Sequence, residues 1–220
     1  MPASPQSNSR PLARVTFIVV AVLIPLVPMG YWISNLAAMM PGPLQSAGLG
    51  FYMLARLLAL LGFVLIFYQF VLTARLPFLE AALKRPKMVK THRSLGKAGF
   101  VMVLAHGVIM LLLDPTLYLE NTLGLIALTL LAIAVLAAWF FKPLKFSLKT
   151  WRAIHLVTYL VLPLVFIHAI LLGSTVLAYR PVWWLFVAMF VGYCLIVVYR
   201  IVRLFRERRS SPKKPAPKKT

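Results

Sequence analysis

The chain of 220 residues is too apolar for a soluble globular protein, since 61% of its residues are hydrophobic and only 13% are charged, against roughly 25% charged in soluble domains. Its 24 lysines and arginines against 4 acidic residues give a formal charge of +20. These cations lie between apolar stretches and in the C-terminal tail rather than on a soluble face, which argues against nucleic-acid binding. We therefore expect an integral membrane protein.

Six apolar segments are each long enough to cross a bilayer, which takes about 20 helical residues. They lie at 15–33, 51–73, 95–113, 122–141, 153–173 and 182–203. The sequence therefore predicts an all-α fold, a six-helix transmembrane bundle that forms one domain over residues 15–203. We expect residues 1–14 to be a cytoplasmic segment and residues 204–220 to be a basic, disordered cytoplasmic tail.

The first segment has two interpretations. Arg10 and Arg14 before an apolar run, with small residues after it, are typical of a secretory signal peptide. The run continues to about Ile33, however, which is longer than the usual apolar region of about 7–15 residues. An uncleaved helix, bent at Pro25 and Pro28, is therefore favoured.

Positive charge is distributed unequally between the loops. One side of the predicted bundle has Arg10, Arg14, Arg75, Lys84, Arg85, Lys87, Lys90, Arg93, Lys142, Lys145, Lys149 and the basic run from Arg203 to Lys219. The other side has Asp114, Glu120, Arg180 and, just inside the second segment, Arg56. Basic loops stay in the cytoplasm, so we expect both termini to be cytoplasmic and the protein to lie in a bacterial cytoplasmic (inner) membrane.

The four histidines form two pairs within the apolar region, His92 with His106 and His155 with His168. Histidine inside a membrane is costly and indicates a functional site, and neutral imidazole is a common iron ligand. Each interval of 13 or 14 residues spans roughly 20 Å of helix, most of a hydrocarbon core of about 30 Å. The third and fifth segments run in the same direction, so we expect His92 and His155 to bind an inner haem iron and His106 and His168 an outer one.

Helical phase agrees with this expectation for one pair only. Fourteen steps of about 100° return to within roughly 40° of the starting face, whereas thirteen steps leave an error of about 140°. His155 and His168 would therefore not face one partner on a straight helix. Pro163 lies between them and is expected to change the winding there.

These residues carry a resemblance to a known superfamily. The stretch from Thr91 to Gly96 followed by His106, and the stretch from Trp151 to His155 followed by Tyr159 and His168, resemble the ferric reductase-like transmembrane domain. That superfamily includes iron reductases, the membrane half of NADPH oxidases, and the haem-binding membrane subunit of a periplasmic methionine sulfoxide reductase system. The resemblance covers residues 15–203 and implies two b haems with electron flow from cytoplasmic reduced flavin to an outer acceptor. The flavin and nicotinamide domains usual in the reductases and oxidases do not follow here, which resembles the stand-alone arrangement.

Other interpretations of the histidines remain open. Single membrane histidines often serve only in packing, although four in two matched pairs disfavour this. Tetrahedral zinc needs its ligands clustered, and these pairs are separated along the helix axis. Quinol-oxidising cytochromes b and b561-type proteins use the same four-histidine arrangement. The only cysteine, Cys194, is not part of a Cys-x-x-Cys-His sequence, so the haems are expected to be non-covalent.

Four basic residues are candidate partners of the haem propionates. Arg93, Lys97 and Arg152 lie at the cytoplasmic ends of the histidine-bearing segments, where charge-assisted pairing with carboxylates is expected. Contact with lipid headgroups is the alternative. Arg56 lies on the outer side, where it is expected to hold an outer propionate or form an acceptor site, unless it only extends to the interface.

The expected function is a membrane electron-transfer subunit with two b-type haems. No G-x-G-x-x-G sequence follows a strand, so the electron donor is expected to be FMN or FAD on a separate flavoprotein reductase, or quinol. The acceptor is expected on the periplasmic side, where a periplasmic oxidoreductase is one candidate. The basic tail is expected to bind anionic lipid or an acidic flavoprotein. The alternatives are a terminal reductase of ferric chelates or oxygen acting at the outer haem, and a non-redox protein in which the histidines bridge helices.

Overall fold

The structure, a computed structural model, describes residues 9–39 and 47–210, and every regular element among them is an α-helix. The elements are α1 (Ser9–Met39), α2 (Ala47–Thr73), α3 (Pro77–Ala82), α4 (Arg85–Leu113), α5 (Leu119–Trp139), α6 (Leu148–Leu156), α7 (Thr158–Leu172), α8 (Ser174–Ala178) and α9 (Arg180–Ser210). Six stretches are long and apolar enough to span a membrane: Arg14–Met39, Gly48–Thr73, Arg85–Leu113, Leu119–Trp139, Leu148–Leu172 and Arg180–Glu207. The predicted all-α class and the six spans are confirmed, and the chain is an integral, multi-pass membrane protein.

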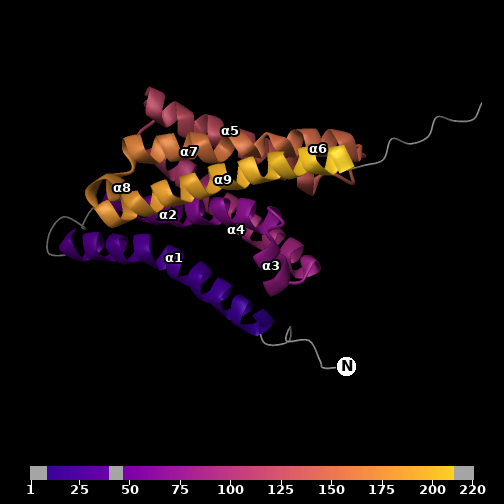
Figure 1. Ribbon diagram of the computed structural model, residues 1–220. Helices are drawn as coiled ribbons and strands as arrows, with labels where there is room; N and C mark the ends of the chain where they lie inside the picture. The colour runs from indigo at the N-terminus through magenta and orange to yellow at the C-terminus, as the bar shows by residue number, and fades with distance from the viewer. Residues whose placement is uncertain (1–8, 40–46, 211–220) are drawn as a thin grey trace, which may run out of the picture.

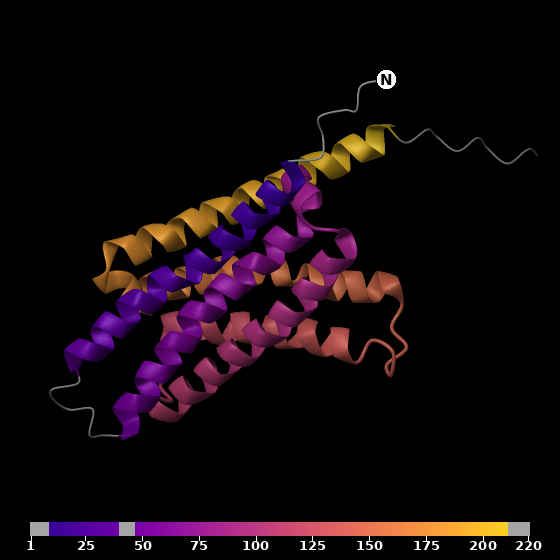
Figure 2. The same cartoon turned by 90° about the horizontal axis from the view of Figure 1, so that it is seen from below.

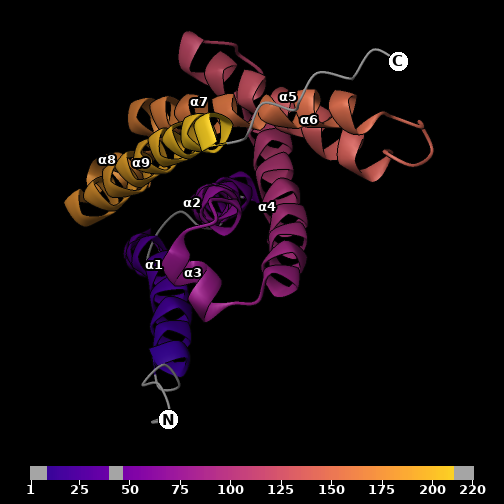
Figure 3. The same cartoon turned by 45° about the vertical axis from the view of Figure 1, so that its right-hand side comes forward.

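The six long spans run lengthwise through the bundle (Figures 1 and 2), and Figure 3 shows that α1 and α4 are inclined to α7 and α9. The start of α1 and the end of α9 lie toward the same end of the bundle, where α3 and α6 also lie, while α8 lies at the opposite end (Figure 1). An even number of spans requires the described ends to share one side. The two ends of the bundle are therefore chemically distinct, and each holds one histidine pair.

Helix α2 is the centre of the packing and has the largest buried share of the six spans. One face of α2 packs Phe63 in a stack with Phe186 of α9, with ring centroids 4.2 Å apart. Further along, Phe70 contacts the rings of Tyr159 and Tyr193 edge to face, at 5.3 Å and 4.8 Å. Many large apolar side chains on the other helices are exposed, as expected for surfaces that face lipid.

Glycines allow α4 to approach α2 closely. A Cβ atom at Gly62 of α2 would lie 2.5 Å from Cγ1 of Val103, and one at Gly99 of α4 would lie 3.2 Å from Cβ of Leu65. Membrane helices lack a hydrophobic driving force for association, so close packing over small residues takes its place. This contact fixes the position of α4 and hence of its two histidines.

Helix α4 begins at Arg85, ten residues before the apolar segment predicted at 95–113. Pro86 occupies the first turn, where proline is well tolerated. The sequence prediction relied on apolar residues alone, so it did not include the charged first turns of α4. As a result His92 lies well inside the helix rather than at its end.

The fifth span is broken, but at Val157 rather than at Pro163. It consists of α6 and α7, and around the junction Val157 N–H donates to the Ile154 carbonyl at 3.1 Å and Leu160 N–H to the Val157 carbonyl at 3.0 Å. These hydrogen bonds join residues three apart, as in a 3₁₀-helix. The rotation per residue is therefore larger than in an α-helix, by about 20°. Tighter winding reduces the phase error of about 140° between His155 and His168.

Pro163 has a different role within α7. Proline has no N–H, so the carbonyl four residues earlier, that of Tyr159, loses its intrahelical partner. The hydroxyl of Tyr193 on α9 donates to this carbonyl at 2.5 Å. A hydrogen bond between helices therefore replaces the one that Pro163 removes, as backbone groups within a membrane require.

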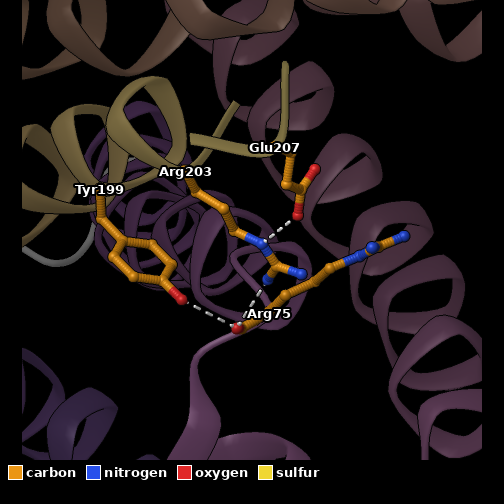
Figure 4. Close-up of polar contacts among 4 residues, drawn as sticks. All are labelled: Arg75, Tyr199, Arg203 and Glu207. Atoms are coloured by element: carbon orange, nitrogen blue, oxygen red, sulfur yellow. Dashed lines mark hydrogen bonds and ion pairs between the residues drawn. The ribbon is translucent and has the colours of Figure 1, made fainter. Parts of the chain in front are cut away.

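The C-terminal helix continues beyond the predicted end of the domain. We expected residues 204–220 to be disordered, but α9 remains helical to Ser210, and residues 211–220 lie outside the described part of the chain. Figure 4 shows two reasons: Arg203 pairs with Glu207 one turn later at 2.8 Å, and both Tyr199 and Arg203 donate to the Arg75 carbonyl, at 3.4 Å and 3.3 Å. These contacts attach the last turns of α9 to the turn after α2.

The Tyr193 hydrogen bond leads to a test of stability. Tyr193→Phe should lower the free energy of unfolding in detergent by about 0.5–2 kcal/mol, because the Tyr159 carbonyl is left without a partner. In a Pro163→Ala background the restored N–H can satisfy that carbonyl, so the same substitution should cost clearly less. Thermal unfolding of the four proteins of this cycle gives the coupling energy. Equal costs in both backgrounds would contradict the explanation.

Candidate functional site

The structure brings the four histidines together in two pairs, each joining α4 to the fifth span. The imidazole centroids of His92 and His155 lie 6.3 Å apart with an interplanar angle of 72°, and those of His106 and His168 lie 6.4 Å apart at 65°. This is the pairing that two parallel spans predict. The break at Val157 places His155 at the end of α6 and His168 on α7.

Both separations equal the distance expected across a shared metal ion. Two imidazoles on opposite sides of one ion have centroids about 6.3 Å apart, since a metal–nitrogen bond is about 2.0–2.1 Å and a ring nitrogen lies about 1.1 Å from its centroid. Within residues 9–39 and 47–210, no three His, Cys, Asp or Glu side chains gather into a metal-binding group. Each pair therefore fits two axial positions of a haem iron better than a tetrahedral zinc site.

Hydrogen bonds hold the outer pair in the state that a ligand requires. Nδ1 of His106 donates to the Ala55 carbonyl on α2 at 3.0 Å, and Nδ1 of His168 donates to the Glu120 carbonyl on α5 at 2.8 Å. A carbonyl only accepts, so the proton is on Nδ1 and the lone pair of a neutral ring is on Nε2. Backbone partners of this kind orient most metal-binding histidines.

Gly124 on α5 makes room for the ring of His168. A Cβ atom at this position would lie 2.9 Å from Cε1 and 3.0 Å from Nδ1 of His168. Real side chains do not approach so closely, and the ring is tied to the Glu120 carbonyl one turn earlier on the same helix. Sequence reasoning had no means of finding this position, because the contact joins residues 44 apart in the chain.

A cavity of about 370 Å³ extends between His106 and His168, walled by apolar side chains from α2, α4, α5 and α7. Its volume falls within the range of about 300–1,000 Å³ typical of ligand pockets. One end is polar and includes Arg56, Tyr118 and Asp114. The hydroxyl and the backbone N–H of Thr116 both donate to the Asp114 carboxylate, which lowers the pKa of that group.

Arg56 lies in the wall of this outer cavity. It donates to Oγ1 of Thr175 at 2.6 Å and to Oδ1 of Asn35 at 3.1 Å, and its guanidinium lies 5.5 Å from the centre of the Tyr52 ring. Its Nε is buried without a hydrogen-bond partner, and Arg56 forms no ion pair with any of the described residues. The structure therefore places a guanidinium without a carboxylate beside the outer histidines.

The inner pair has a different environment. Nδ1 of His92 and Nδ1 of His155 are buried without a hydrogen-bond partner, although the backbone of Gln69 on α2 approaches His92. The ring of Trp151, one turn before His155, stacks on it with centroids 5.2 Å apart. Buried nitrogens without partners are costly, so this pair also fits a site completed by a further group.

The remaining basic candidates are positioned differently from the expectation. Arg93, Lys97 and Arg152 are exposed, and none of them lines the cavity next to His92. The basic residue there on a neighbouring span is Arg200, from α9. Arg200 lies near the end of an apolar span, only three residues before the basic run that begins at Arg203, and the sequence alone does not distinguish it from that run.

Comparison with known proteins agrees with this geometry. Residues 58–166 match the family model described as ferric reductase like transmembrane component. The match runs from α2 to α7 and includes His92, His106 and His155, and it ends two residues before His168.

No curated protein and no solved structure matches the chain. The family match begins within α2 and ends within α7, so it covers three of the four paired histidines. Residues 58–166 are thereby identified as a ferric reductase-like transmembrane component.

Proposed function

We propose that this protein is a membrane electron-transfer subunit that holds two b-type haems, one at each histidine pair. The observation that carries the proposal is the repeated separation of 6.3 Å and 6.4 Å between imidazole centroids on the same two spans. The family match supports a redox role in the membrane. When bound, the haems supply one-electron chemistry at iron.

The residues of this chain would serve that chemistry in four ways. The histidines would supply ring nitrogens to the iron, and the Ala55 and Glu120 carbonyls hold the rings of His106 and His168. Apolar side chains of the outer cavity exclude water. Arg56 supplies positive charge for a propionate at the outer site, where it has no carboxylate partner within the described chain. Close packing of α2 on α4 keeps the ligand separation constant.

Direction follows from the positive-inside rule. Basic residues concentrate at the end of the bundle that holds His92 and His155, which supports a cytoplasmic position for that pair. We propose that electrons enter there from reduced flavin on a separate flavoprotein, or from quinol, and leave near His106 and His168 to a periplasmic acceptor. A bacterial inner membrane with both termini in the cytoplasm is part of this proposal.

A second candidate is a terminal reductase of ferric chelates or oxygen. The polar end of the outer cavity, with Arg56, Tyr118 and Asp114, favours it, since a small acceptor could enter there. The two functions differ in one measurement. A terminal reductase would pass electrons to ferric chelate or oxygen in the purified protein at a rate that accounts for turnover, whereas an electron-transfer subunit would need its periplasmic partner.

Haem stoichiometry tests the ligand set. The purified protein should contain close to two low-spin b haems per chain by the pyridine haemochrome assay. His92→Ala and His155→Ala should each remove the inner haem, and His106→Ala and His168→Ala the outer one. Cys194→Ala, at an exposed position on α9, is the control and should retain both. Absence of haem in the wild type would contradict the proposal and support the alternative in which the histidines only bridge helices.

The tight contact at Gly124 gives a second test. Gly124→Ala should reduce outer haem content several-fold while the inner haem is retained, because the new methyl group displaces the His168 ring. Gly192→Ala is a matched control, since a Cβ there meets Phe67 at an ordinary 3.5 Å. Spectra of the reduced proteins measure the remaining haem. Full occupancy of both sites in Gly124→Ala would show that the ring position is not required.

Electron entry can be measured in inside-out vesicles. Reduced flavin with a flavoreductase should reduce both haems of the wild type. His92→Ala should slow reduction at the outer pair by orders of magnitude, because the route is lengthened by roughly 20 Å. NADPH alone should give no rapid reduction, since the described residues are helical and offer no dinucleotide-binding sheet. Rapid reduction by NADPH alone would refute the need for a separate donor.

A further inference from the structure

A second cavity, of about 230 Å³, lies beside His92 and is lined by basic groups. Its walls include Arg75 from the turn after α2, Arg85 at the start of α4, and Arg200 from α9. Thr73 and Glu80 add a hydroxyl and one carboxylate. Three arginines and a single acidic residue therefore line this cavity, and of these only Arg200 is half-buried, whereas Arg75, Arg85 and Glu80 are exposed.

Most N–H donors of the Arg200 guanidinium form no hydrogen bond with the described residues. A guanidinium carries five donors, and this one makes a single long hydrogen bond, to Oγ1 of Thr73 at 3.4 Å. The guanidinium also lies 5.6 Å from the centre of the Tyr159 ring. It belongs to no ion pair in the described part of the chain. Arg200 thus lies half-buried in the cavity beside His92 and has no ion-pair partner among the described residues.

Arg75 is held in place through its backbone. Its φ of 55° lies in the left-handed region, which costs a side-chain-bearing residue energy, and its carbonyl accepts from Tyr199 and Arg203. Its own guanidinium extends away from Arg203 and Glu207 (Figure 4). The Glu207 carboxylate on α9 therefore pairs with Arg203, while Arg75 lines the cavity.

The two ends of the bundle show the same arrangement. At the outer pair Arg56 comes from α2, and at the inner pair Arg200 comes from α9, so each guanidinium is on a span that carries no histidine. Neither takes part in an ion pair within residues 9–39 and 47–210. Guanidinium groups bind carboxylates and phosphates through two parallel hydrogen bonds. Arg93, Lys97 and Arg152 do not line the cavity beside His92.

We propose that the cavity beside His92 is an oxyanion-binding site, with Arg200 as its principal ligand and Arg75 and Arg85 in support. Its ligand is a carboxylate or phosphate on a redox group, and the proposal rests on the proposed electron-transfer function. Two sources have this chemistry: a propionate of the inner haem and the phosphate of a reduced FMN donor. Positive charge at this position favours the reduced state of the inner redox centre.

The experiment compares Arg200→Gln and Arg200→Lys with wild type. Lys149→Gln is the charge control, because Lys149 is exposed on α6 at the same end and does not line the cavity. Each protein is purified by size exclusion, and haem content and midpoint potentials are measured without a donor. Reduction is then followed with reduced FMN and with reduced riboflavin, which lacks the phosphate. Arg75→Gln serves as a second variant if Arg200→Gln does not fold.

The two sources give different results. If the ligand is a propionate, Arg200→Gln should lower inner haem retention or its midpoint potential without a donor, and both flavins should be affected equally. If it is a phosphate, the donor-free properties should be unchanged, and the KM for reduced FMN should rise about tenfold or more, the scale of a lost charge-assisted hydrogen bond. In either case Arg200→Lys should be intermediate, since charge remains without the planar fork.

The proposal is overturned if the wild type holds two haems and Arg200→Gln gives the same result as Lys149→Gln in every measurement. That result is expected if Arg200 contacts only lipid headgroups. Absence of haem in wild type instead refutes the proposed function. In that case FMN binding, measured by quenching of flavin fluorescence, still decides the matter. Binding that depends on Arg200 supports the phosphate arm, and binding independent of Arg200, or none, overturns the site.

Discussion

Polar side chains inside the membrane have to find partners within the protein, and in the described part of this bundle five of them donate to backbone carbonyls of neighbouring spans. Hydrogen bonds of this kind are Trp32 to Met53, Tyr68 to Ala21, His106 to Ala55, His168 to Glu120 and Tyr193 to Tyr159. Each joins two different spans, and two of them fix the outer histidines. The same requirement that stabilises the bundle therefore also sets the orientation of its ligands.

The two histidine pairs have equal ring separations but different surroundings. The outer rings are held by carbonyls, face an apolar cavity, and have Arg56 at its polar end. The inner rings have no such bonds at Nδ1 and lie beside a small, basic cavity. Hydrogen bonding to the ligands and nearby charge are separate means of tuning a redox centre. The two histidine pairs therefore offer a bound group different hydrogen bonding and different nearby charge.

Sequence reasoning found what depends on local pattern. Hydropathy located the six spans, and the intervals of 14 and 13 residues identified His92 with His155 and His106 with His168, because stacking along a helix follows from residue count. It missed Gly124 and Arg200, which matter only through contacts between residues far apart in the chain. It also missed the continuation of α9 to Ser210, which depends on contacts with the turn at Arg75.

The difference between the two intervals explains why only one histidine-bearing span is broken. His92 and His106, fourteen residues apart, share a face of an uninterrupted α4. His155 and His168 are thirteen apart, so an unbroken helix would turn one of them away from α4. The tightened turns near Val157 rotate α7 in the direction that corrects this, and the bond from Tyr193 compensates for the proline that follows. The break is thus a consequence of placing two ligand pairs at one common separation.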